Sequence, residues 1–281
     1  MGVDHKMSKM KKIGYMQLAP VLGDLEATIR KIDEILNQVI SADILVLPEL
    51  CNSGYNFMSY EQAWETSEEI ECSLFIQYLE DICKKNNFFI VSGFNERYRD
   101  VLYNSAILVS PKGYLGRYRK LHLFMNEKDF FKPGNEAPPL FDIGGCKMGM
   151  LICFDWIFPE VWRILALKGA EIICHPSNLI LPGLAQRAIP IHALTNRIYI
   201  VTANRVGKEG NLTFTGLSIV ADPKGDILLQ ASDRDEEVGI VQIKPALARD
   251  KNVTSKNDIF KDRRPDFYDL LAVSKTEERP E

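Results

Sequence analysis

Three polar residues of this sequence, Glu49, Lys120 and Cys153, each come directly after an apolar run that predicts a β-strand. Strand ends are rigid and often open into a cleft, so they are suitable places for catalytic groups. A cation lowers the pKa of a neighbouring thiol, and a carboxylate within reach can take the thiol proton. An ammonium can also balance negative charge on an attacked carbonyl oxygen or nitrile nitrogen. The three residue types together indicate attack by a cysteine on such a carbon.

Each of these residues alone is weak support for catalysis. A cysteine at a strand end is more often an inert buried thiol, and a single Glu or Lys after a strand is usually a solvated loop charge. A Cys–His pair is another arrangement that activates a thiol, and it stays open here. None of the four histidines carries a local protease signature: His5, His122, His175 and His192.

Length and composition are those of a globular protein, with 281 residues, 46% of them hydrophobic and 26% charged. The net charge is -4 and the basic residues are scattered, which is unlike a nucleic-acid binder. No apolar run is long enough to span a membrane. The six cysteines are too widely spaced for a disulfide scaffold, and no CxxC pair suggests a metal site. We therefore expect reduced thiols in a cytoplasmic protein without a metal.

Helical and strand-like segments alternate along the whole chain, which predicts a single α/β domain over residues 12–245. Residues 1–11 are basic without a following apolar segment, so we expect a flexible leader and no secretory signal. Residues 246–281 are charged and irregular, and we expect them to wrap a surface or a partner subunit. The expected helices are 25–39 with Asp24 as N-cap, 72–85, 159–167 with proline in its first turn, and 189–197. The expected strands are 13–18, 44–47, 88–93, 105–109, 114–118, 147–152, 172–174, 198–203, 217–221, 227–229 and 238–241, and residues 127–139 are expected to be irregular.

The sequence around the three polar residues resembles the catalytic motifs of the nitrilase superfamily, the carbon–nitrogen hydrolases. The glutamate motif is LPEL at 47–50, the lysine motif is YRKLHLF at 118–124, and the cysteine motif is GMLICFD at 149–155. The motifs stand in the family's order at typical separations. Further likeness covers nearly the whole chain, and its motifs are HPSN at 175–178, NR at 204–205, GLS at 216–218 and DPKG at 222–225.

The resemblance implies a four-layer α-β-β-α sandwich of two mixed β-sheets, without a cofactor. It also implies a homodimer or higher homo-oligomer, with the tail 246–281 at the subunit interface. By this resemblance Cys153 attacks the substrate carbon, and Glu49 accepts the thiol proton and later activates water. Lys120 and the backbone N–H of Phe154 hold the developing negative charge. Glu127 matches the family's second glutamate, which orients Lys120 and helps to position the substrate.

Tyr55, Phe154, Trp156 and Asn178 occupy positions next to the motifs that often line the family's cleft, so we predict that they bind substrate. Tyr55 and Trp156 could equally be core aromatics, and Asn178 could cap a turn instead. For His175 we favour a structural hydrogen bond over contact with substrate.

A small carboxamide or nitrile is the expected substrate, hydrolysed to an acid and ammonia through a thioester or thioimidate on Cys153. Phe154 and Asp155 follow the nucleophile where nitrilases proper commonly have Trp-Glu, which favours an amide. The alternative of an N-carbamoyl amino-acid amidohydrolase lacks an evident carboxylate clamp, because no cation follows the cysteine motif until Arg163. The string from Cys153 to Trp156 also resembles a group of aliphatic nitrilases, so nitrile activity stays open.

Two other classes of protein remain as alternatives. A non-catalytic binding or scaffold protein could share the fold, although the loss of a triad residue would then be expected. An ammonia-generating domain would normally be joined to a nucleotide-binding domain, and the chain has no GxxxxGK[ST] loop.

Overall fold

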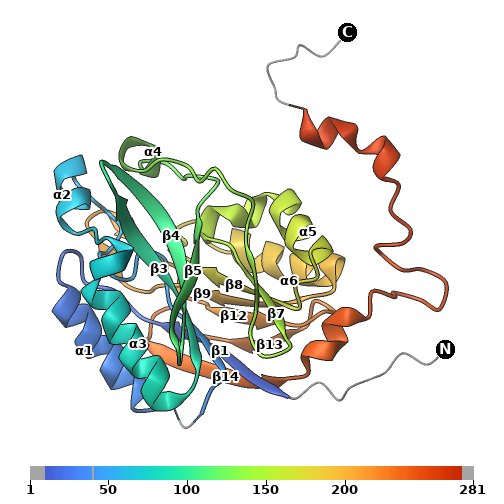
Figure 1. Cartoon of the computed structure of the whole chain (residues 1–281), viewed down its shortest axis with the longest axis horizontal. Coiled ribbons are helices and arrows are strands. Elements are labelled where there is room, and N and C mark those ends of the chain that lie inside the picture. The colour runs from blue at the N-terminus through green and yellow to red at the C-terminus, as the bar shows by residue number, and fades with distance from the viewer. Residues whose placement is uncertain (1–9, 40, 274–281) are drawn as a thin grey trace.

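The computed structural model describes residues 10–39 and 41–273, which form two six-stranded β-sheets with helices on their outer faces (Figure 1). The first sheet contains β1 (Lys11–Gln17), β2 (Ile44–Val46), β3 (Phe89–Tyr98), β4 (Val101–Ser110), β5 (Gly113–Arg119) and β14 (Glu237–Ile243). The second sheet contains β6 (Leu140–Asp142), β7 (Lys147–Met150), β8 (Ile172–Pro176), β9 (Tyr199–Ala203), β12 (Ile219–Ala221) and β13 (Ile227–Gln230). A small separate hairpin is formed by β10 (Lys208–Glu209) and β11 (Leu212–Thr213).

Both sheets are mixed and follow the same plan. Their strand orders are β14-β1-β2-β3-β4-β5 and β6-β7-β8-β9-β12-β13. In each sheet three parallel strands lie at the centre, β1-β2-β3 and β7-β8-β9, and the outer neighbours pair antiparallel. Parallel strands need crossover connections, and helices supply them in both halves of the chain.

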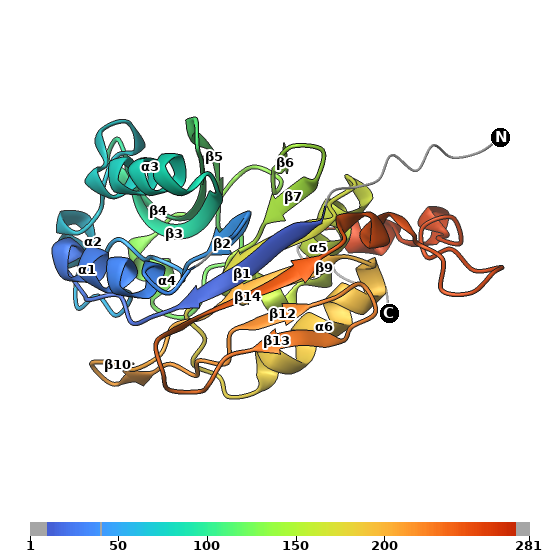
Figure 2. The ribbon, with the colours of Figure 1, turned by 90° about the horizontal axis from the view of Figure 1, so that it is seen from below.

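The helices complete the layers. The longer ones are α1 (Leu25–Leu36), α3 (Leu74–Asn86), α5 (Pro159–Leu167) and α6 (Leu184–Asn196), and the short ones are α2 (Tyr60–Glu65) and α4 (Glu127–Phe130). Buried residues of α1 and α3 pack on the first sheet, and those of α5 and α6 pack on the second. Figures 1 and 2 show these helices on opposite outer sides of the two sheets. The predicted four-layer α-β-β-α sandwich is confirmed.

Two faces of the first sheet have different neighbours because side chains alternate along a strand. Leu45 and Ile90 lie in the cluster with the helices α1 and α3. Val46 and Val91 lie in the cluster that also contains the second sheet. The strand β2 is therefore buried on both sides, as its wholly apolar sequence predicts.

The capping and turn chemistry of the helices agrees with the sequence. The side chain of Asp24 accepts a hydrogen bond from the N–H of Ala27 at 2.8 Å, which confirms it as the N-cap of α1. The helix α5 begins at Pro159 and ends at Leu167, as expected. The helix α6 begins at Leu184, earlier than expected, and contains Pro190 in its interior. Because proline usually marks a helix start, the sequence predicts a helix from residue 189 and omits the first residues of α6.

Polar segments account for the remaining differences. The strands β3 and β4 extend beyond the expected apolar runs as a long antiparallel hairpin. Their extensions contain Asn95 and Glu96, which are buried by bonds to residues far away in the sequence. The helices α2 and α4 and the strand β6 were not expected. Residues 127–139, expected to be irregular, begin with the helix α4.

The last part of the described chain, residues 265–273, lies apart from the sandwich (Figure 1). After Pro245–Arg249, a short 3₁₀-helix, Lys251 still donates to the carbonyl of Asn196 on α6 and Phe260 packs against Arg163 of α5. The chain then runs away from the sheets to the 3₁₀-helices Pro265–Phe267 and Asp269–Ala272 (Figures 1 and 2). Its apolar side chains there are exposed, among them Phe267 and Leu270. At the other end Lys11 already pairs with Ile243 in the first sheet. The expected leader otherwise falls on residues 1–9, outside the described residues, as does the end of the expected tail at 274–281.

Candidate active site

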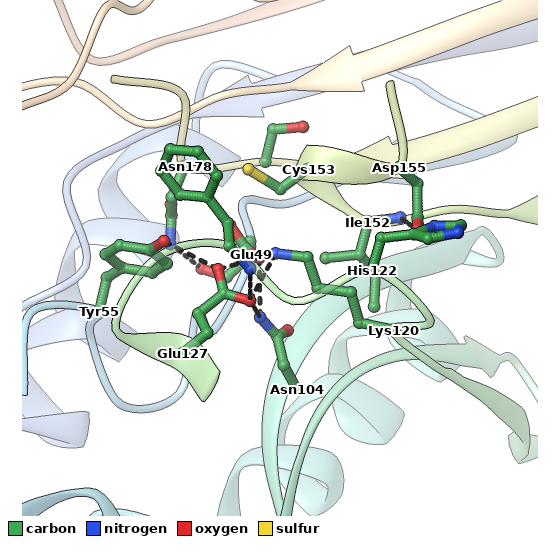
Figure 3. Close-up of polar contacts among 12 residues, drawn as sticks. Glu49, Tyr55, Asn104, Lys120, His122, Glu127, Ile152, Cys153, Asp155 and Asn178 are labelled. Carbon is green, nitrogen blue, oxygen red and sulfur yellow. Dashed lines mark hydrogen bonds and ion pairs between the residues drawn. The ribbon is translucent and has the colours of Figure 1, made fainter. Parts of the chain in front are cut away.

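The side chains of Glu49, Lys120 and Glu127 form a buried hydrogen-bonded cluster (Figure 3). The Lys120 ammonium donates to Glu49 Oε1 at 2.6 Å and to both Glu127 oxygens at 2.8 Å. Lys120 and Glu49 are fully buried and Glu127 is nearly so. A buried charge is tolerated when it is paired, and here one ammonium serves two carboxylates.

Neighbouring groups fix the orientation of both carboxylates. The Asn104 side chain donates to Glu49 Oε1 at 2.8 Å and lies 3.4 Å from Glu127 Oε2. The Tyr55 hydroxyl donates to Glu127 Oε1 at 2.8 Å, and the N–H of Phe124 donates to its Oε2 at 3.2 Å. The cluster is therefore held by neutral donors as well as by charge.

Glu49 lies on a tight turn after β2. The next residue, Leu50, has a φ of 48°, in the left-handed region. The strand β3 passes so closely that a Cβ at Gly93 would lie 2.3 Å from the Cα of Glu49. The backbone carbonyl of Glu49 also accepts a hydrogen bond from the Asn178 side chain at 2.9 Å. These contacts give the carboxylate one fixed position between the sheets.

Cys153 opens a 3₁₀-helix, Cys153–Ile157, just after β7. Its φ of 38° lies in the left-handed region, where a residue with a side chain is strained. Its carbonyl accepts a hydrogen bond from His175 Nε2 at 2.9 Å. Figure 3 shows its sulfur beside the ion cluster, and the charges of Glu49, Lys120 and Glu127 all act on this thiol.

Burial dominates the electrostatics of the site. It raises the pKa of the Cys153 thiol well above its usual range, and Glu49 raises it further while Lys120 lowers it. Burial also raises the pKa of Glu127 to about 7, although Lys120 lowers it. Burial lowers the pKa of Lys120, but Glu127 and Glu49 outweigh burial and raise this pKa overall. These shifts favour a neutral Cys153 thiol beside a charged Lys120 ammonium.

A narrow cleft beside Cys153 is lined mainly by apolar side chains. It is lined by Phe124, Phe154, Trp156, Asn178, Leu179, Ile180 and Leu181. A second hollow, of about 70 Å³, shares Phe124 and Ile180 with it and is also lined by Tyr55 and Glu127 of the ion cluster. Linings of this kind favour a small, largely apolar ligand.

Two buried oxygens of the site residues have no hydrogen-bond partner within the described residues. They are Oε2 of Glu49 and Oδ1 of Asn178. Both side chains are held through their other polar atoms or backbone. A buried acceptor without a donor is costly, so these oxygens are suited to a ligand that donates hydrogen bonds.

The structure brings together every site residue that the sequence indicated. Glu49, Lys120 and Glu127 share hydrogen bonds, Tyr55 joins them, and Phe154, Trp156 and Asn178 line the cleft with Cys153. Asn178 also anchors the turn of Glu49, and His175 makes the favoured structural bond. Sequence reasoning missed Asn104, because a polar residue within a strand gives no local signal of its partner. Within the described residues no group of three or more His, Cys, Asp and Glu is placed to hold a metal.

The fold and this cluster define the class: an α-β-β-α sandwich whose buried glutamates and lysine meet a cysteine at the end of a cleft. A family model described as carbon-nitrogen hydrolase matches residues 12–252. A nitrilase of Pyrococcus abyssi is 45% identical over 92% of this chain and 99% of its own length. An (R)-stereoselective amidase of a Pseudomonas species is 34% identical over 90% of this chain and 91% of its own length.

Among solved structures, a carbon-nitrogen hydrolase from Helicobacter pylori has a TM-score of 0.82 at 27% identity. The match covers 94% of this chain and 99% of that one. The chain therefore belongs to the carbon–nitrogen hydrolase family, and it is a hydrolase of the nitrilase and amidase type. Among the described residues, no helix is both long and apolar enough to cross a membrane.

Proposed function

We propose that this hydrolase converts small, uncharged carboxamides to carboxylic acids and ammonia, with Cys153 as nucleophile, Glu49 as general base and Lys120 as stabiliser of the oxyanion. Glu127 holds the Lys120 ammonium through two hydrogen bonds of 2.8 Å. Tyr55, Phe154, Trp156 and Asn178 contact the substrate. No metal or cofactor takes part in this scheme.

The observation that carries the proposal is the unequal environment of the two Glu49 oxygens. Oε1 accepts hydrogen bonds from Lys120 and Asn104, whereas Oε2 is buried without a donor among the described residues. A general base needs one oxygen held in place and one free to take a proton. Because the thiol pKa is raised, the proton leaves Cys153 only as the sulfur attacks.

The reaction then follows in two covalent steps. Cys153 Sγ bonds to the amide carbon while its proton passes to Glu49 Oε2, and the oxyanion faces Lys120 and the N–H of Phe154. The C–N bond breaks as Glu49 returns the proton to nitrogen, which releases ammonia and leaves a thioester. Glu49 next takes a proton from water, whose oxygen attacks the thioester carbon. The C–S bond breaks, the acid leaves, and the thiol recovers its proton from Glu49.

The unpaired acceptors favour an amide over a nitrile. Glu49 Oε2 and Asn178 Oδ1 both lack a donor among the described residues. A carboxamide NH₂ group brings two N–H donors, whereas a nitrile brings none. An N-carbamoyl amino acid would in addition need a cation for its carboxylate. Arg163, the first cation after the cysteine motif, lies on α5 and donates to the carbonyl of Thr195 on α6. This supports an uncharged acyl group.

The assembly and location of the protein are part of the same proposal. We propose a homodimer in which residues 246–281 lie over the partner subunit, because the exposed apolar side chains of 246–273 have little to pack on within one chain. We also propose a cytoplasmic location, which is supported by six cysteines that are all free thiols. Size-exclusion chromatography with light scattering would contradict the dimer by giving a monomer mass.

The proposed reaction is tested by ammonia release from matched acetamide, butyramide, butyronitrile and N-carbamoyl glycine. Amides should be turned over fastest, and Cys153→Ala should abolish release from all four. The control is Cys72→Ser, at an exposed free thiol, which should keep full activity. Faster release from the nitrile would contradict the substrate class, and release by Cys153→Ala would contradict the nucleophile.

A further inference from the structure

Asp155 is a fully buried carboxylate whose hydrogen bonds reach both halves of the site. Its Oδ2 accepts from the N–H of Ile152 and from the Tyr118 hydroxyl, each at 2.9 Å. Its Oδ1 lies 2.6 Å from His122 Nδ1. A carboxylate only accepts hydrogen bonds, so Nδ1 of His122 carries the proton. Figure 3 shows this contact on the far side of Lys120 from the glutamates.

The partners of Asp155 flank Cys153 and Lys120 in the sequence. Ile152 immediately precedes Cys153, and Asp155 follows it by two positions. Tyr118 and His122 lie two positions before and two positions after Lys120. One carboxylate therefore ties the turn of the nucleophile, on the second sheet, to both flanks of the lysine segment that leaves the first sheet.

The nucleophile's turn needs such support. Cys153 has a φ of 38°, and strain of this kind persists only where surrounding contacts over-determine the backbone. Asp155 provides two such contacts to Ile152. Its side chain accepts from the N–H of Ile152, and its own N–H donates to the carbonyl of Ile152 at 2.9 Å. The N–H of Trp162 Nε1 donates to the Asp155 carbonyl at 3.0 Å and fixes the turn to α5.

The lysine segment is held by the same group. The Tyr118 hydroxyl, which donates to Asp155, also accepts from the N–H of Leu121 at 3.2 Å. The His122 ring is stacked on Phe158 with ring centroids 3.6 Å apart, so it cannot turn away from the carboxylate freely. Both flanks of Lys120 are thus fixed relative to the residue two positions after Cys153.

We propose that Asp155, through Tyr118 and His122, is a positioning residue that sets the place of Cys153 against Lys120. The inference rests on the proposed function, since it assigns these two residues their roles. Asp155 itself touches neither the substrate nor the sulfur. It acts because a shift of about 1 Å between nucleophile and oxyanion donor can slow a reaction about 100-fold.

The test is Asp155→Asn, assayed for kcat, KM, thermal unfolding and the rate at which iodoacetamide alkylates Cys153. An asparagine keeps the shape, but its NH₂ group replaces either the oxygen that accepts from His122 or the one that accepts from Ile152 and Tyr118, which weakens the link. We expect kcat to fall by about 100-fold with KM within about threefold of the wild type, and the alkylation rate to change. His122→Asn, which can still donate, should retain more activity than His122→Ala.

The matched control is Glu171→Gln, at the residue that precedes β8 and binds the first residue of β7. Glu171 is also buried, and its Oε2 accepts from the N–H of Lys147 at 2.9 Å, far from the cleft. It should lower the unfolding temperature without changing kcat. If Asp155→Asn does not fold, Tyr118→Phe carries the test, because it removes a single hydroxyl and should also lower kcat rather than raise KM.

The inference is overturned if Asp155→Asn and Glu171→Gln lower stability alike and both leave kcat and alkylation unchanged. It is also overturned if the loss lies in KM alone, which would make Asp155 part of the substrate pocket. Turnover by Cys153→Ala would instead contradict the proposed function. Loss of turnover in Cys153→Ala together with full kcat in Asp155→Asn would contradict the positioning role alone.

Discussion

Lys120 Nζ lies 2.6 Å from Glu49 Oε1 although the two side chains are fully buried and 71 residues apart in sequence. The ends of two different strands of the first sheet supply them, β2 for Glu49 and β5 for Lys120. Because Glu127 binds the same ammonium, removing Lys120 leaves two buried carboxylates without their counterion.

Lys120→Met should therefore lower the free energy of unfolding by about 3–5 kcal/mol and abolish turnover, since two buried carboxylates lose their counterion. Urea denaturation measures the first effect and ammonia release the second. The control is Lys31→Met, whose 2.7 Å ion pair with Glu236 lies at the surface and should change stability by about 1 kcal/mol or less. Equal losses in the two variants would contradict the buried network.

Glu49→Gln should lower kcat by about 100- to 10,000-fold, because an amide cannot take the thiol proton. The glutamine oxygen can still accept from Lys120 and Asn104, so the variant should remain folded and bind butyramide. Single-turnover kinetics at saturating substrate would show this split. A variant that loses butyramide binding but keeps the wild-type kcat would contradict the role of Glu49 as general base.

The raised pKa of Glu127 makes stability depend on pH. Burial raises this pKa from 4.5 to about 7, so the folded protein keeps a proton that the unfolded chain has lost between these values. The free energy of unfolding should then fall as the pH rises from about 4.5 to about 7, by about 1.4 kcal/mol for each unit of pKa difference. Glu127→Gln should remove this part of the slope, as urea titrations at several pH values would show. An unchanged slope in the variant would exclude Glu127 as its source.

Tyr55→Phe should move the acid limb of the kcat profile to higher pH. The Tyr55 hydroxyl donates to Glu127 at 2.8 Å and favours the ionised carboxylate, which lowers its pKa. Without this donor Glu127 stays protonated to higher pH and holds Lys120 less well. Leu212→Ala, on the far wall of the same hollow, serves as the control and should leave the limb in place.

Gly93→Ala should destabilise the fold and reduce kcat together. An added Cβ would lie 2.3 Å from the Glu49 Cα and the Leu50 N–H nitrogen, both backbone atoms. Either β3 or the turn of Glu49 must move. Gly144→Ala is the comparison, because nothing lies within 4 Å of its added Cβ and only its positive φ opposes the change. Wild-type kcat in Gly93→Ala would show that the turn tolerates displacement.

Much of the fold could be predicted because its strands and helices carry their own apolar periodicity. The wholly apolar β2 and the proline that opens α5 are local signals. The polar ends of β3 and β4 carry no such local signal. Glu96 is buried there because Arg119 and Ser105 bind it from other positions in the sequence. The missed start of α6 has a different cause, since Pro190 lies within the helix.

Part of the site could be predicted because local sequence signals mark three of its residues. Glu49, Lys120 and Cys153 follow strands, and their motifs mark them in the sequence. Asn104 and Asp155 stand where a sequence gives no sign of a distant partner, so their contacts become visible only in three dimensions. Phe154 and Asp155 already favour an amide in the sequence, and the acceptors left without donors, which are visible only in the structure, support the same proposal.

The central claim is that Cys153 carries the acyl group during turnover. Peptide mapping by mass spectrometry, on enzyme quenched in acid during butyramide hydrolysis, tests it directly. The account predicts a butyryl adduct on the peptide that contains Cys153, absent from Cys153→Ala and unaffected by Cys72→Ser. A butyryl group on another residue, or ammonia release at the wild-type rate by Cys153→Ala, would contradict it.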